Sequence, residues 1–305
     1  MKCYFYAMIF QKTEVKMPTH LDTEHPFTDA MEAHMSTPHI AVIIPCYNAA
    51  ETLAEAVYSA LMQVAVSSIW IIDDQSTDHS RSIAEQLTCQ YPEKIRLLCM
   101  PTRSGASLAR NWAALHVNEP HIAFLDADDV YERYALDAPA HAFRAMPELA
   151  AIRLALHPLD WPEHYTAHEQ FAQAWWRIEM LGAGNLIIKR NIYLAAGGFP
   201  HDDLFKRFGG EDVSFNLALY NHSLTIGTLF DQPGVHYRHK KGSHGERMLN
   251  ALLYAQQPEH ITAADLQAAD AVTERIKQNL RDIHQALDNG NDGKVVPLVV
   301  VEKTP

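Results

Sequence analysis

Residues 39–63 read HIAVIIPCYNAAETLAEAVYSALMQ, and this stretch decides the fold class. An apolar run from Ile40 leads to Pro45, which is typical of a strand that is buried on both faces. The residues that follow repeat apolar side chains at helical spacing, with Leu53 and Val57 on one face. A buried strand followed by an amphipathic helix predicts a βα unit.

Three further strands and two further helices continue the alternation. We predict strands at 68–74, 94–100 and 121–129, and helices at 76–87 and 104–117. Elements that alternate in this way predict right-handed crossovers and a mostly parallel sheet flanked by helices, an α/β fold. In such sheets, ligands bind beyond the carboxyl ends of the strands.

The second half of the chain is less regular. The pattern there predicts a strand at 150–156, a helix at 168–181, a helix that begins at Glu211, an edge strand at 224–230 and a helix at 262–288. The domain organisation expected from these patterns is an N-terminal extension (1–38, poorly ordered), a main domain (39–250, with halves 39–130 and 131–250) and a C-terminal helix and tail (251–305).

Composition excludes several classes of protein. The formal net charge of the 305 residues is -12, which argues against a nucleic-acid backbone as partner. No apolar run reaches the roughly 18 residues that a membrane span needs. The four cysteines lack metal-binding or disulfide spacing, which fits a reducing cytoplasmic compartment. Met17 and Met35 could each serve as the start of translation.

The strand at 121–129 ends in the sequence DADD, which contains Asp126, Asp128 and Asp129. Three carboxylates this close repel one another, so a positive partner is expected. Mg2+ and Mn2+ prefer oxygen ligands and often bind one or two carboxylates together with substrate phosphates. A solvated acidic turn is the alternative.

Other candidate residues lie at further element ends. Asp73 and Asp74 follow the second strand, where one can cap the next helix while the other accepts hydrogen bonds from a base or ribose. Arg103 and Arg110 flank a helix start that could hold an anion, or could pair with carboxylates. Asp212, with Glu211, begins a helix after two glycines and could act as a general base, although local evidence favours helix-dipole complementarity.

The segment HYRHKKGSH, residues 236–244, is rich in basic side chains. Its spacing does not match a structural zinc site. It could contact phosphate, or it could be a solvated basic loop.

Taken in order, these segments resemble a family 2 glycosyltransferase with the GT-A fold. The resemblance rests on residues 39–61, IIDDQSTDHS (71–80), SGASLARNWAAL (104–115), IAFLDADDVY (122–131) and GGFPHDDLFKRFGGEDVSFNLAL (197–219). It implies an inverting hexosyl- or hexosaminyltransferase with a nucleotide-sugar donor, UDP-linked in most of the family, and Mg2+ or Mn2+.

The resemblance also implies roles for individual residues. Those for the nucleotide-sugar are Pro45, Tyr47, Asp74 (as the reader of uracil), Arg110, Asp126 and Asp128; those for the metal are Asp128, Asp129 and His239. Asp212 is implied as the catalytic base, with Glu211 as its acceptor-side neighbour. The implied acceptor is a saccharide or a lipid-linked sugar in cell-surface polysaccharide or glycolipid synthesis, at the inner face of the membrane. Peripheral membrane association and a homodimer are further expectations.

Two other functions remain open on the sequence alone. A sugar-phosphate nucleotidyltransferase would share the sheet, but PCYNAAET (45–52) lacks the glycine-rich basic loop that such enzymes carry after the first strand. A non-catalytic nucleotide-binding module of the same fold would not need both Asp128 and Asp212.

Overall fold

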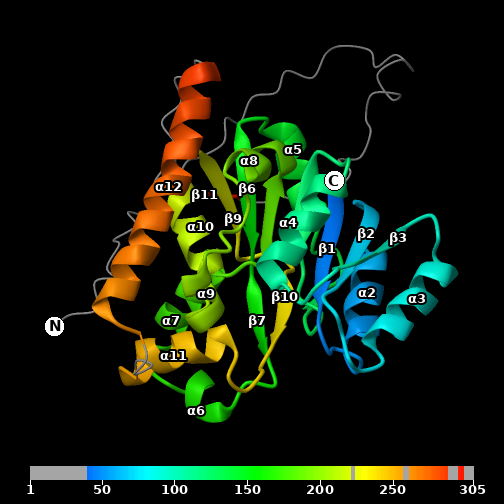
Figure 1. Cartoon of the computed structure of the whole chain (residues 1–305), viewed down its shortest axis with the longest axis horizontal. Coiled ribbons are helices and arrows are strands. Elements are labelled where there is room, and N and C mark those ends of the chain that lie inside the picture. Colours follow the sequence, from blue (N-terminus) through cyan, green and yellow to red (C-terminus); the bar gives the residue numbers. More distant parts are fainter. Residues whose placement is uncertain (1–39, 221–223, 257–260, 288–294, 299–305) are drawn as a thin grey trace, which may run out of the picture.

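The structure is a computed structural model that describes residues 40–220, 224–256, 261–287 and 295–298. The predicted N-terminal extension lies outside these residues. Within the described chain, an eight-stranded sheet in the order β11-β9-β6-β8-β4-β1-β2-β3 forms the centre (Figure 1). Its strands are β1 (Ile40–Cys46), β2 (Val66–Asp73), β3 (Ile95–Cys99), β4 (His121–Phe124), β6 (Leu149–Leu154), β8 (Leu186–Lys189), β9 (Thr225–Leu229) and β11 (Val295–Pro297).

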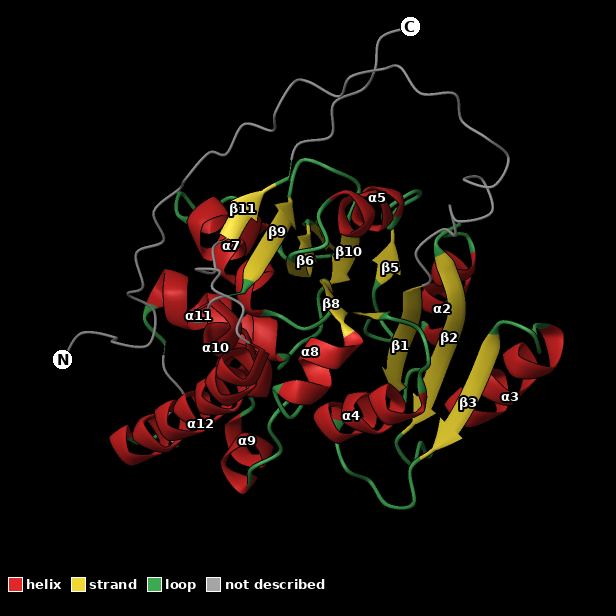
Figure 2. Ribbon diagram, turned by 90° about the horizontal axis from the view of Figure 1, so that it is seen from above, coloured by secondary structure: helices red, strands yellow, loops and turns green. Residues whose placement is uncertain are grey.

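Helices cover both faces of this sheet, with α4 and α8 on one face and α2 and α3 on the other (Figure 2). The helices are α2 (Leu53–Leu61), α3 (Ser80–Gln90), α4 (Ala106–His116), α5 (Asp137–Ala145), α6 (Glu163–Thr166), α7 (Phe171–Leu181), α8 (Arg190–Ala195), α9 (Asp203–Phe208), α10 (Glu211–Tyr220), α11 (His244–Tyr254) and α12 (Ala263–Leu287). None of these helices combines the length and the apolar character that crossing a membrane requires.

Most strand pairs are parallel, as predicted. β8 alone among the eight strands runs antiparallel to its neighbours, β4 and β6. The chain runs from β1 to β2 and β3 on one side, then crosses back to place β4 on the other side of β1. This reversal opens a crevice beyond the carboxyl ends of β1 and β4, the position where open α/β sheets bind ligands.

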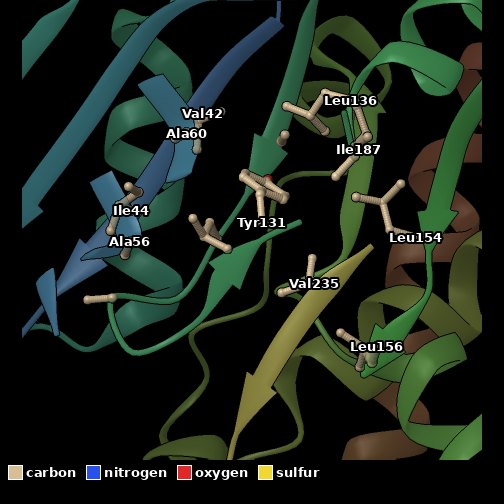
Figure 3. Close-up of a cluster of buried hydrophobic side chains, with 14 of the residues drawn as sticks. Val42, Ile44, Ala56, Ala60, Tyr131, Leu136, Leu154, Leu156, Ile187 and Val235 are labelled. Atoms are coloured by element: carbon tan, nitrogen blue, oxygen red, sulfur yellow. The ribbon is translucent and has the colours of Figure 1, made fainter. Parts of the chain in front are cut away.

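The core explains why β1 reads as a continuous apolar run. Val42 and Ile44 pack with Ala56 of α2 in one buried cluster (Figure 3), whereas Ile43 packs with Ala109 of α4 in a second cluster on the opposite face. Successive side chains of a strand point to opposite faces, so a strand covered on both sides must be apolar throughout. Each such side chain contributes roughly 1.5–3 kcal/mol when fully buried.

A small three-stranded sheet, in the order β5-β10-β7, lies beside the main one. It consists of β5 (Val130–Tyr131), β7 (Leu156–Leu159) and β10 (Val235–Arg238). β10 pairs antiparallel with β5 and parallel with β7. This pairing brings the basic segment that follows β10 back to the acidic turn that precedes β5.

For the C-terminal part, the structure contradicts one prediction and confirms another. The strand predicted at 224–230 forms as β9, but the prediction of an edge position is wrong, because β11 pairs with it through Val295 and Ile226. The predicted C-terminal helix is α12, whose Val272 and Ile276 share a buried cluster with Phe215 of α10. The division of the chain into domains stays a prediction.

Candidate active site

Three carboxylates gather in the turn after β4, at the crevice. Asp126, Asp128 and Asp129 offer ligand oxygens that lie within 4.8 Å of one another. The turn is closed by the backbone, since the N–H of Asp129 donates to the carbonyl of Asp126 over 3.1 Å. Burial, followed by the charge of Asp126, raises the pKa of the Asp128 carboxyl group. A cation bound here would relieve the repulsion.

Asp129 is the most deeply buried of the three, with 1% of its surface exposed. Its Oδ1 accepts a hydrogen bond from the backbone N–H of Arg238 over 2.8 Å, whereas its Oδ2 is buried without a partner in the described chain. Burial and the charges of Asp126 and Asp128 raise its pKa well above the usual value. An unpaired buried oxygen within a carboxylate cluster suits a hard divalent cation.

Gly184 leaves space beside this cluster. A Cβ atom at this position would lie 3.5 Å from Oδ2 of Asp129 and 3.6 Å from Oδ2 of Asp126. The sequence GAGN, residues 182–185, therefore borders the acidic turn. The cluster and this gap together fit a metal ion.

Arg110 of α4 supplies one positive partner for the cluster. Its guanidinium forms an ion pair with Asp126. Arg110 is buried, with 5% of its surface exposed, and its Nε lacks a partner in the described chain. Burial acts to lower the pKa of Arg110, but the charges of Asp126, Glu211 and Asp212 outweigh it and raise the pKa. Arg110 therefore lies within the field of both acidic groups of the site.

The second acidic group opens α10. Gly209 and Gly210 precede it with positive φ angles of 74° and 89°, a conformation that favours glycine. Oε1 of Glu211 accepts a hydrogen bond from the hydroxyl of Ser107 in α4 over 2.9 Å, and burial followed by the charge of Asp212 raises the pKa of Glu211. Oδ1 of Asp212 accepts the N–H of Val213 over 2.9 Å. Glu211 is thus tied to α4.

A cavity of about 430 Å³ joins the two acidic groups. Its lining includes the end of β1, the acidic turn, the start of α10 and the first turn of α11. The predicted site residues that line it are Pro45, Tyr47, Arg110, Asp126, Asp128, Glu211 and Asp212. The remaining three, Asp74, Asp129 and His239, are absent from the lining.

Asp74 anchors a loop in this structure. Its two carboxylate oxygens accept the backbone N–H groups of Ser104 and Gly105, each over 2.7 Å. The same loop carries Arg103, whose guanidinium lies over the ring of Tyr47 at 3.9 Å from the ring centroid. Asp74 therefore organises the loop beside Tyr47, and its role as a reader of uracil stays a prediction.

His239 does not line the cavity, and its role as a metal ligand stays a prediction. Its Nε2 is 2.9 Å from Oε1 of Glu246, and its ring packs edge-on against Trp161. The next residue, Lys240, faces the acidic turn. Nζ of Lys240 lies 3.5 Å from Oδ2 of Asp128.

Helix α11 was not expected from the sequence, and it adds several residues to the cavity. Its contributions are Ser243, His244, Gly245, Arg247 and Met248. The hydroxyl of Ser243 accepts the N–H of Glu246 over 3.2 Å and caps the helix. The pattern S-x-x-E is a known helix-start signal and could have revealed α11.

Comparison with known proteins identifies the family of this chain. Residues 41–198 match the family model described as glycosyl transferase family 2. TuaG of Bacillus subtilis (strain 168), provisionally assigned as a teichuronic acid biosynthesis glycosyltransferase, is 36% identical over 101 residues. This match covers 33% of the chain and 40% of TuaG, so the chain spans well under half the length of this curated relative.

Two solved structures share the fold. TarS 1-349 of S. aureus in complex with UDP-GlcNAc has a TM-score of 0.54 at 18% identity, over 81% of this chain and 73% of that one. The mannosyltransferase PcManGT from Pyrobaculum calidifontis, solved with GDP-Man and Mn2+, also has a TM-score of 0.54, at 20% identity, over 83% of this chain and 76% of that one. At these identities the likeness concerns the fold.

Proposed function

The chain belongs to glycosyl transferase family 2 and has the GT-A fold, and on that premise we propose that it moves a sugar from a UDP-sugar to a hydroxyl acceptor with inversion at the anomeric carbon. The observation that carries this proposal is the cavity shared by the turn of Asp126 and Asp128 and by Asp212. Such a cavity can hold a diphosphate near one acidic group and a hydroxyl near the other.

The donor would occupy the side of the cavity near β1 and β4. Tyr47 lines the cavity and can flank a base, and the guanidinium of Arg103 lies over its ring at 3.9 Å from the centroid. Lys240, 3.5 Å from Asp128, is available to the diphosphate. The complexes of TarS with UDP-GlcNAc and of PcManGT with GDP-Man support a nucleotide-sugar as the class of donor.

Mg2+ or Mn2+ fits the acidic turn, with Asp128 and Asp129 as the residues that would hold it. Their carboxylates are clustered, Asp129 is buried and Asp128 is partly buried, and Oδ2 of Asp129 lacks a partner in the described chain. When bound, such an ion stabilises the negative charge that develops on a leaving diphosphate.

The chain's own groups would carry out the proton transfer. Asp212 accepts the proton of the acceptor hydroxyl as that oxygen attacks the face of the sugar opposite the leaving group. Lys240 donates hydrogen bonds to the departing diphosphate. Glu211, held by Ser107 at 2.9 Å, keeps the head of α10 against α4 and so fixes where Asp212 points.

The biological setting rests on analogy with relatives. TuaG is provisionally assigned to teichuronic acid biosynthesis, and we extend this class of pathway to the present chain. The acceptor would then be a saccharide or a lipid-linked sugar, met in the cytoplasm at the inner face of the membrane.

Calorimetric titration of UDP, GDP and ADP into the protein, with and without Mn2+, tests this proposal. We expect UDP to bind in a metal-dependent manner, followed by transfer when UDP-sugars and acceptors are screened. Preference for GDP would move the donor to a GDP-sugar. The proposal is contradicted if none of the three nucleotides binds.

A further inference from the structure

We propose that His244, the first residue of α11, positions the carboxylate of Asp212 for proton transfer. His244 lies outside residues 41–198, which match the family model. The inference rests on the proposed function, because it assigns a role in the same reaction. It makes His244 an acceptor-side positioning residue.

The two side chains face the same cavity. Nε2 of His244 lies 3.9 Å from Oδ1 of Asp212, and both residues line the cavity together with Glu211. This separation is about 1 Å too long for a hydrogen bond. Catalytic hydrogen bonds are often long before substrate binds and shorten in the substrate complex.

The side chain of His244 is partly exposed, but its ring nitrogens lack the partners that buried polar atoms normally have. Both of its ring nitrogens are shielded from solvent, and neither forms a hydrogen bond to any described residue. Buried polar atoms in folded proteins are almost always paired, and an exception calls for a reason such as a catalytic role or an absent ligand. The carboxylate that forms an ion pair with His244, at 3.9 Å, is that of Asp212.

The turn before α10 is shaped around this imidazole. A Cβ atom on Gly209 would lie 3.2 Å from Nδ1 of His244, and one on Gly210 would lie 3.9 Å from Cε1. Arg247, one helical turn further along α11, donates to the carbonyl of Gly242 over 2.6 Å and to that of Phe208 over 3.4 Å. These contacts fasten α11 to the segment that carries Asp212.

The proposed role follows from the hydrogen bonds of the carboxylate. Oδ1 of Asp212 accepts the N–H of Val213 and, once substrate binds, an N–H of His244, which leaves Oδ2 to take the acceptor's proton. The acceptor oxygen forms its bond to the anomeric carbon, and the bond from that carbon to the diphosphate breaks with its electron pair. The proton ends on Asp212, and His244 keeps its own.

Steady-state kinetics of His244→Ala and His244→Gln test this role, alongside UDP binding by calorimetry. In His244→Ala we expect kcat to fall by about 10- to 100-fold, the usual effect of losing an orienting partner. The Kd for UDP should stay within twofold of wild type. In His244→Gln, whose amide nitrogen can replace Nε2 as a donor, most of the lost kcat should return.

The pH profile separates positioning from a general structural defect. An N–H donated to a carboxylate favours its charged form, so its loss should move the acidic limb of kcat/KM to higher pH in His244→Ala. The matched control is His157→Ala, a half-exposed histidine beside Glu132 that does not line the cavity, and its profile should match wild type.

The outcomes also distinguish this inference from the proposed function. A wild-type protein that transfers sugar, with a His244→Ala variant that keeps its kcat and its acidic limb, overturns the role of His244 alone. Equal values of kcat in His244→Ala and His244→Gln would also overturn the role of His244 alone. A wild-type protein that neither binds UDP nor transfers sugar overturns the proposed function and this role together.

Discussion

The guanidinium of Arg110 and the carboxylate of Asp126 form an ion pair that joins α4 to the turn after β4. Arg110 is buried, whereas the Asp126 side chain keeps 34% of its surface exposed. Asp126 therefore has a buried counter-ion from the chain itself, whereas the cation beside Asp128 is the exposed Lys240. Asp128 and Asp129 remain as the pair that would hold a metal ion.

Replacing Arg110 with Met should destabilise the fold, because it leaves Asp126 partly buried without its cation. We expect the free energy of unfolding to fall by about 2–3 kcal/mol, below the range for fully buried pairs because Asp126 can regain some water. Denaturant unfolding measures this change. Arg81→Ala is the control, since its pair with Glu85 is exposed on both sides and its loss should leave the free energy of unfolding close to that of wild type.

Asp128→Asn should abolish the metal dependence of UDP binding, because it removes one charge from the predicted metal site. Calorimetry with and without Mn2+ measures the effect. Asp203→Asn changes an exposed carboxylate of α9 and should bind like wild type. Unchanged Mn2+ dependence in Asp128→Asn would contradict the metal assignment.

Asp212→Asn should leave UDP binding intact and slow transfer by about 10² to 10⁴, the usual contribution of a general base. The amide keeps the shape of the side chain and its hydrogen bond from Val213, but it cannot take a proton at neutral pH. Rates under saturating donor and acceptor measure the loss. Near-normal turnover would remove Asp212 from the role of base.

Gly198→Ala should destabilise the protein more than Gly105→Ala. Both glycines have positive φ angles, 70° and 86°, so alanine is strained at either position. At Gly198, however, the added Cβ would also lie 2.4 Å from Oδ1 of Asn111, whereas at Gly105 it meets no atom within 4 Å. Thermal unfolding of the two variants compares strain alone with strain plus a clash. Equal losses would show that the Asn111 contact adjusts freely.

Stability should fall in mildly acidic solution because of His121. Burial, together with the charge of Lys189, lowers the pKa of His121 from 6.5 to about 4. Between these values the unfolded chain binds a proton that the folded chain does not, so stability drops as pH falls from about 6.5 towards 4. In His121→Phe the loss between pH 7.5 and pH 5 should be smaller than in wild type.

Denaturant unfolding at the two pH values measures this difference. The control is His79→Phe, which replaces an exposed histidine and should keep the pH dependence of wild type. Identical pH dependence in His121→Phe and wild type would show that His121 does not cause the loss.

The sequence determined the central sheet and its helices because local pattern was sufficient there. Apolar runs that are buried on both faces, followed by amphipathic repeats, specify β1, α2 and the units after them without reference to distant contacts. Parallel strands also place their carboxyl ends at one edge, so Asp126 and Asp128 could be assigned to the ligand crevice from order alone.

Positions that depend on the pairing of distant segments were decided only by the tertiary structure. β11 replaced β9 at the edge of the sheet, since strand neighbours are not encoded in either strand's periodicity. Likewise, Lys240 lies 3.5 Å from Asp128 because the pairing of β10 with β5 and β7 brings the segment after β10 back to the acidic turn.

The same distinction applies to the site as a whole. The sequence by itself predicted roles for Asp128 and Asp212, since acidic residues at element ends are visible as local motifs. It could not show that His244 lies 3.9 Å from Asp212 or that Arg110 is the partner of Asp126. His244 and Asp212 are 32 positions apart, and they meet because α11 packs on the first turn of α10. Arg110 and Asp126 are 16 positions apart, and they meet because α4 packs on the sheet.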